Sequence, residues 1–206
     1  MKIRNKFPKC NEEKNNLLLA DGWILIKESK NIIQSIIFSI PLMIFLGLIS
    51  IFIINLFSPI TLNEFGIQKN SFSMTINLID LITVIIFIYI LIYIHEIAHL
   101  IFVPNFLNSD KTFLGLSWFG GYTYTEDEIT KERYILITVI PFLLISVICV
   151  VILGSTGYLT PIMKLICIFN AIGSSVDFSN SLLVLKQVPN ISKIVMNGRL
   201  SYYKVI

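Results

Sequence analysis

The sequence alternates long apolar runs with short polar stretches, and four of the runs are long enough to cross a membrane as helices. They cover residues 31–57, 77–103, 134–153 and 159–186. Because a bilayer core about 30 Å thick needs about 20 apolar helical residues, each run predicts a transmembrane helix. Pro41 lies inside the first run and predicts a bend, and Pro141 lies inside the third. The pattern therefore predicts an all-α membrane protein, with residues 31–186 as its four-helix membrane domain.

The segments on either side of the membrane domain are basic. Residues 1–30 carry seven Lys and Arg side chains, and residues 187–206 form a short basic tail. Within the leader, residues 17–26 around Trp23 predict a short interfacial element, because Trp is enriched at the level of the lipid headgroups. A loosely ordered segment with a few apolar anchors is the alternative for this stretch.

The longest internal connection, residues 104–133, joins the second and third apolar runs. Residues 111–119 are rich in β-forming side chains, Gly120-Gly121 gives a turn signal, and residues 122–125 alternate as a second short strand. The pattern predicts a short β-hairpin that lies against the membrane between helices 2 and 3. Such a hairpin could hold an extended peptide by strand addition, and a plain loop with aromatic anchors is the alternative.

The composition supports an integral membrane protein. The chain has 206 residues, of which 55% are hydrophobic and 14% charged, whereas soluble domains carry about 25% charged residues. Its length fits one small domain, and the lipid bilayer is its first partner. The net charge of +3 gives no indication of a nucleic-acid partner. The three cysteines are widely spaced and predict neither a disulfide framework nor a Cys-based zinc site.

The candidate chemistry lies near the end of the second apolar run, in the motif His95-Glu96-Ile97-Ala98-His99. On a helix the two histidines project from one face about 6 Å apart along the axis, a spacing that suits two ligands of one Zn²⁺. Glu96 lies beside them, placed to take a proton from a metal-bound water. The chain has no other histidine, and no charged residue precedes the motif from Leu81 to Ile94. Because charged groups are costly inside a membrane helix, this placement indicates a metal site.

A third ligand is predicted from the fourth apolar run. Asp177 is the only acidic residue after Glu132, and it shares one helix side with Asn170, Ser174 and Ser181. If both runs end at the same membrane face, His95 lies about 12 Å and Asp177 about 14 Å of helix from that end. This agreement in depth predicts that Asp177 completes a three-ligand site with His95 and His99. Small polar residues also stabilise helix pairs, which is the alternative for this side.

The distribution of positive charge predicts the orientation. Four spans put both termini on one side, together with the basic leader, the tail and the 104–133 connection. The opposite side has Lys69, an uncharged loop at residues 154–157, and Lys164. The positive-inside rule then places both termini, and the end that carries the motif, in the cytoplasm.

These residues permit the hydrolysis of peptide bonds in a membrane protein or peptide substrate. Zn²⁺ bound by His95, His99 and Asp177 would keep an open position for water, and Glu96 would act as general base and later as acid. Asn170 or Ser174 could bond a reacting carbonyl or support Asp177. A non-enzymatic protein that binds a metal or a partner, of regulatory or immunity type, is the alternative function. A metal transporter is less favoured, because the spans show a single polar cluster and no conduction path.

The motif at the end of a span, the Gly-containing hairpin and the Asp late in the last span resemble the membrane zincins. The chain is similar to the site-2 protease class and most closely resembles the putative zincin peptidase family of small bacterial membrane proteins. The resemblance implies proteolysis at or within a bacterial plasma membrane, with His95, His99 and Asp177 as zinc ligands and Glu96 as base. Site-2 proteases carry Asn-Pro-Asp-Gly around the third ligand, whereas this chain has Ser175-Val176-Asp177-Phe178.

Overall fold

The protein is mostly helical, and four of its helical spans are long and apolar enough to cross a membrane. The computed structural model describes residues 2–3, 7–29, 31–65, 67–68, 71–72, 78–117 and 120–206. The spans are α2 (Ile32–Phe57), α3 (Leu78–Ile101), a third made of α4 (Lys131–Pro141), η2 (Phe142–Ile148) and α5 (Cys149–Ser155), and a fourth made of α6 (Pro161–Gly173) and α7 (Ser175–Gln187). The four predicted apolar runs are therefore confirmed as helical spans.

The third and fourth spans are interrupted, although the sequence pattern predicts continuous helices over residues 134–153 and 159–186. Pro141 has no N–H to donate and ends α4, and the chain continues as the π-helical segment η2. In the fourth span α6 ends at Gly173, and the backbone N–H of Ser174 bonds to the Asn170 carbonyl at 2.9 Å. Hydrophobicity alone does not reveal the break after Pro141, because the residues that follow it are almost all apolar.

Helix α2 packs closely against the fourth span through small side chains. Its buried face comprises Ser39, Leu46, Gly47, Ser50 and Ile54. A Cβ added at Gly47 would lie 3.4 Å from Cγ1 of Ile172, so glycine permits the close approach of α2 and α6. The face indicates van der Waals packing between helices, as expected inside a bilayer, where apolar burial gives little driving force.

The basic tail is a β-hairpin rather than a simple polar extension. Strands β8 (Ser192–Asn197) and β9 (Leu200–Val205) pair with β2 (Ile24–Leu25) and β7 (Ile129–Thr130) in an antiparallel sheet of order β2-β9-β8-β7. Trp23 is buried against Val195 and Tyr202 of this sheet. Its ring therefore belongs to the core that joins the leader to the tail, and the position of residues 17–26 relative to the lipid headgroups stays a prediction. Helix α1 (Glu12–Ala20) precedes it and begins at Asn11, whose side chain accepts a bond from the Lys14 N–H.

A half-buried carboxyl group lies at the edge of this sheet. Glu28 follows β2 and hydrogen-bonds to Ser201 of β9. Burial disfavours its charged form and raises its pKa from the ordinary 4.5 to about 7, although the bonds to Ser201 act in the opposite direction.

The predicted strands of the 104–133 connection are present and paired. Strand β5 (Thr112–Ser117) pairs antiparallel with β6 (Gly120–Thr125), and β1 (Lys2–Ile3) adds to β5 in parallel. Gly120 and Gly121 belong to β6 and not to the turn, so the predicted turn position is wrong. Residues 118–119, which join the strands, lie outside the described residues. The position of this hairpin against a membrane remains a prediction.

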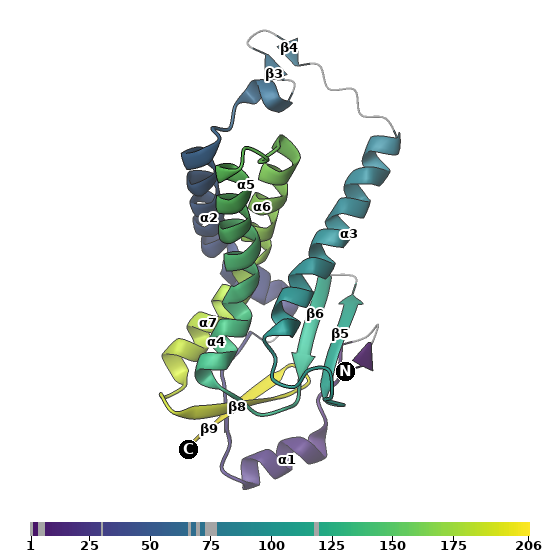
Figure 1. The fold of residues 1–206 in the computed structure, drawn as a ribbon. Coiled ribbons are helices and arrows are strands. Elements are labelled where there is room, and N and C mark those ends of the chain that lie inside the picture. The colour runs from purple at the N-terminus through teal and green to yellow at the C-terminus, as the bar shows by residue number, and fades with distance from the viewer. Residues whose placement is uncertain are drawn as a thin grey trace.

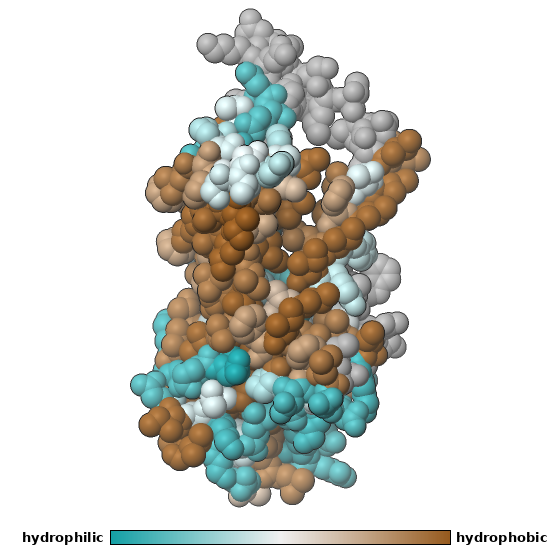
Figure 2. Space-filling view, in the orientation of Figure 1, coloured by the Kyte–Doolittle hydropathy of each residue, from teal (hydrophilic) through white to brown (hydrophobic). Residues whose placement is uncertain are grey.

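The three-stranded and four-stranded sheets lie at one end of the helical bundle, and both termini lie at that end (Figure 1). The opposite end carries η1 (Leu62–Phe65) and the short strands β3 (Ile67–Gln68) and β4 (Ser71–Phe72), while Lys69 lies outside the described residues. Apolar side chains form a broad band over the helices, and hydrophilic side chains gather over the sheets (Figure 2). The arrangement is that of a multi-span membrane protein with a polar domain at the end that bears its termini.

Candidate metal centre

The motif occupies the last turns of α3, where this helix meets β6. His95 and His99 project from the same side of α3, and their ring centroids lie 4.9 Å apart. Thr123 of β6 donates its hydroxyl to the backbone carbonyl of Glu96 at 2.9 Å. This bond fixes the strand against the helix at the motif itself.

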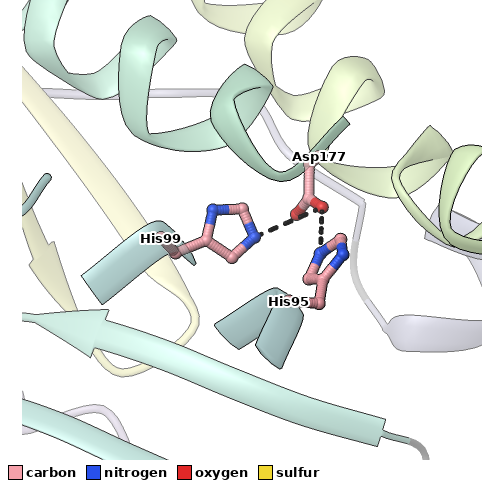
Figure 3. Close-up of side chains that lie close together, drawn as sticks. All are labelled: His95, His99 and Asp177. Carbon is pink, nitrogen blue, oxygen red and sulfur yellow. Dashed lines mark hydrogen bonds and ion pairs between the residues drawn. The ribbon is translucent and has the colours of Figure 1, made fainter. Parts of the chain in front are cut away.

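Asp177 reaches the two histidines from the first turn of α7. Its Oδ2 lies 3.2 Å from Nε2 of His95 and 3.4 Å from Nε2 of His99. The three side chains point toward one another from α3 and α7 (Figure 3). The structure thus brings together His95, His99 and Asp177, as predicted from the similar depths of His95 and Asp177 in their membrane spans.

The three candidate ligand atoms are close enough to hold one metal ion, and the two distances to Asp177 fit a tetrahedral zinc site. They all lie within 4.8 Å of one another. Two ligand atoms at about 2.1 Å from Zn²⁺ in a tetrahedral site are about 3.4 Å apart, which matches both distances to Asp177. The side chains of His95, His99 and Asp177 are 14%, 8% and 24% exposed, so the site is largely enclosed by the protein.

The second nitrogen of each imidazole has its own partner. Nδ1 of His95 lies 2.9 Å from Oδ1 of Asn170, and Nδ1 of His99 lies 2.6 Å from the backbone carbonyl of Ile137. A neutral imidazole that donates its Nδ1–H presents a lone pair at Nε2. Both Nε2 atoms therefore face the Asp177 carboxylate as acceptors, and three converging acceptors are the donor set that a divalent cation requires.

Asn170 and Ser174, which the sequence suggests as partners of Asp177 or of a reacting carbonyl, have different contacts in the structure. Asn170 reaches the site, but its side chain bonds to His95 rather than to Asp177. Ser174 donates its hydroxyl to the Asn170 backbone carbonyl at 2.8 Å and lies between α6 and α7. The expectation that Ser174 bonds Asp177 has no support in these contacts.

Glu96 is buried between α3 and β6 and is 7% exposed. Its side chain lies against Gly121, since a Cβ added there would meet Glu96 Cγ at 2.3 Å. The sequence suggests Gly121 only as a turn residue, and it gives no indication of Thr123 or of the Ile137 carbonyl. The available signal was a glycine within a strand, which often marks a close approach to another group.

The fold and the site together define a multi-span membrane protein with a candidate metal centre where the bundle meets its polar domain. Residues 87–192 match the model of the putative zincin peptidase family, and this match covers about half of the chain. The chain belongs to that family, whose description is that of a zinc metallopeptidase. The matched region contains the complete motif and Asp177. Comparisons with curated proteins and with solved structures give no match.

Proposed function

We propose that this protein is a zinc-dependent membrane endopeptidase, with His95, His99 and Asp177 as metal ligands and Glu96 as general base. The observation that carries the proposal is the convergence of three ligand atoms from two spans, next to a buried glutamate on the same helix turn. The family of the chain supports this function.

In this proposal His95, His99 and Asp177 bind the metal, and Glu96 transfers protons. When bound, Zn²⁺ supplies a Lewis acid that polarises a peptide carbonyl and lowers the pKa of a water. Glu96 takes the proton of the attacking water and returns a proton to the leaving amine. Its burial against β6 limits the directions in which the carboxylate can turn.

The substrate we propose is a membrane protein or peptide that is cut near the membrane face on the side of the termini. The site lies near the last turn of α3, where the bundle gives way to the sheets. The excess of Lys and Arg in the leader supports a cytoplasmic position for that face.

The proposal is tested with purified protein in detergent micelles, using metal analysis and hydrolysis of fluorescently labelled casein. The wild-type protein should contain about one zinc per chain and lose activity with a chelator, as a single catalytic site requires. Glu96→Gln should retain zinc and lose about 100- to 10,000-fold in rate, the usual contribution of a general base. Full activity in Glu96→Gln would exclude the mechanism.

The same experiment separates the alternative of a non-enzymatic metal- or partner-binding protein. In that case the wild-type protein binds zinc without cleaving, and Glu96→Gln leaves its cellular role unchanged while His95→Ala abolishes it.

A further inference from the structure

The third span lies behind both histidines, and its helical break provides acceptors on the side that faces them. Ile137 and Pro141 are one helical turn apart at the end of α4, directly before η2. Each contributes a backbone carbonyl to the hydrogen bonds around one histidine.

The Ile137 carbonyl that contacts His99 lacks its usual helical donor, because Pro141 has no N–H. In a regular α-helix the N–H of residue 141 would donate to the carbonyl of residue 137, but proline has no N–H to give. The Ile137 carbonyl instead accepts from Nδ1 of His99 at 2.6 Å. Because a carbonyl can only accept, this bond requires the proton of His99 to be on Nδ1 and leaves Nε2 for the metal.

The contact to His95 runs through Asn170, and its direction is fixed by two backbone carbonyls. The Asn170 amide nitrogen donates to the Pro141 carbonyl at 3.1 Å and to the Ser146 hydroxyl at 2.9 Å. Ser146 donates in turn to the Cys167 carbonyl at 2.7 Å, so its oxygen is free to accept. The Asn170 oxygen must then face His95 as an acceptor, which places the proton of His95 on Nδ1.

We propose that the helix break at Pro141 is the element that orients both metal-binding histidines. The Ile137 carbonyl accepts from His99, the Pro141 carbonyl accepts from Asn170, and Asn170 is the positioning residue for His95. The inference rests on the ligand set of the proposed function, and it does not depend on peptide hydrolysis. It assigns Asn170 to the histidine and not to a substrate carbonyl.

Pro141→Ala is the decisive variant, because it restores an N–H that competes for the Ile137 carbonyl. A helix without an internal proline is more stable, so the variant should unfold at the same or a higher temperature than the wild-type protein. Its zinc affinity should nevertheless fall by about 10- to 100-fold, the usual effect of losing a partner behind a metal ligand. Loss of affinity in a protein of unreduced stability is not a folding defect.

Asn170→Leu tests the other histidine. It should also lower zinc affinity by about 10- to 100-fold, since Nδ1 of His95 loses its acceptor. Asn55→Leu is the matched control: Asn55 lies on α2, bonds to the Ile51 carbonyl at 2.8 Å, and is exposed. This variant should bind zinc like the wild-type protein.

The spectroscopic readout uses the fact that the chain has two histidines, so ¹⁵N-histidine labelling gives two imidazole signal sets. In zinc-loaded protein in micelles, both rings should be protonated at Nδ1 and metal-bound at Nε2. Pro141→Ala should change the His99 signals, and Asn170→Leu should change those of His95. Wild-type zinc affinity in both variants, or metal bound at Nδ1 in the wild-type protein, would overturn the inference.

These measurements require no cleavage assay. A wild-type protein that binds zinc but does not cleave would refute the proposed function and leave this inference standing. If the wild-type protein cleaves and both variants keep its zinc affinity, the proposed function stands and this inference is refuted.

Discussion

Gly121 offers the sharpest test of the role of Glu96. The three atoms nearest to a methyl group added at Gly121 all belong to Glu96, and none belongs to a proposed metal ligand. A Cβ at Gly121 would lie 2.3 Å from Cγ of Glu96 and 2.9 Å from its Cδ and Oε1. The φ angle of Gly121 is not positive, so alanine adds no backbone strain. The closest overlaps of the Gly121→Ala side chain are all with Glu96, so we expect its effect to come mainly from that residue.

The surrounding contacts decide which part moves. Thr123 holds β6 to α3 through its 2.9 Å bond to the Glu96 carbonyl, and the pairing of Gly121 with Leu116 holds the strand from its other edge. The Glu96 side chain is then the part that yields. A misplacement of about 1 Å costs about 100-fold in rate, which corresponds to about 2.7 kcal/mol in the barrier. We expect kcat to fall by about that factor while zinc content stays unchanged.

The assay is hydrolysis of labelled casein in micelles by Gly121→Ala, Glu96→Gln and the double variant. If Gly121→Ala acts through Glu96, the double variant should be no slower than Glu96→Gln alone. Gly173→Ala is the matched control, since a Cβ added at Gly173 meets no atom within 4 Å. A wild-type rate in Gly121→Ala, or the same loss in both backgrounds, would refute the reasoning.

Three further outcomes are expected. Asp177→Ala should weaken zinc binding by more than about 100-fold, beyond the range for residues behind a ligand, as measured by competition with a chelator. Glu28, with its pKa raised from 4.5 to about 7, should make the folded state lose stability as pH rises through that range, by at most about 3 kcal/mol; Glu28→Gln should remove this slope in pH-dependent unfolding followed by Trp fluorescence. Lys131→Met should cost about 1–3 kcal/mol without changing zinc content, because the buried Lys131 amine donates to the Val188 carbonyl at 2.7 Å.

The spans and the meeting of the three ligands could be predicted because their signals are local. Apolar length defines the spans, and polar side chains inside an apolar run are conspicuous wherever they occur. The rise of an α-helix then converts sequence position into depth, which is why Asp177 could be matched to His95 before any contact was known.

The polar domain could not be predicted in the same way, because its sheet joins segments far apart in the sequence. Ile24 pairs with Tyr203, and Trp23 is buried only through that pairing. The Gly198-Arg199 turn between β8 and β9, with φ of 60° at Gly198, was a local signal for the second hairpin. The prediction for the tail rests on its basic charge and does not use this turn signal.

The irregular features of the third and fourth spans also follow from the site and not from hydrophobicity. A carbonyl inside a regular helix already accepts from the N–H four residues further on, so only its second lone pair is left for a neighbouring side chain. An imidazole buried among apolar helices needs such an acceptor, since an unpaired buried polar group costs about 1–3 kcal/mol. The Pro141 break and the π-helical segment after it make carbonyls available on the side that faces α3, while α2, which contributes none of the site residues named here, runs as a single helix from Ile32 to Phe57. Restoring regular α-helix at residue 141 should therefore improve the helix and impair the metal site together, a combination that neither a purely structural proline nor a purely catalytic one would produce.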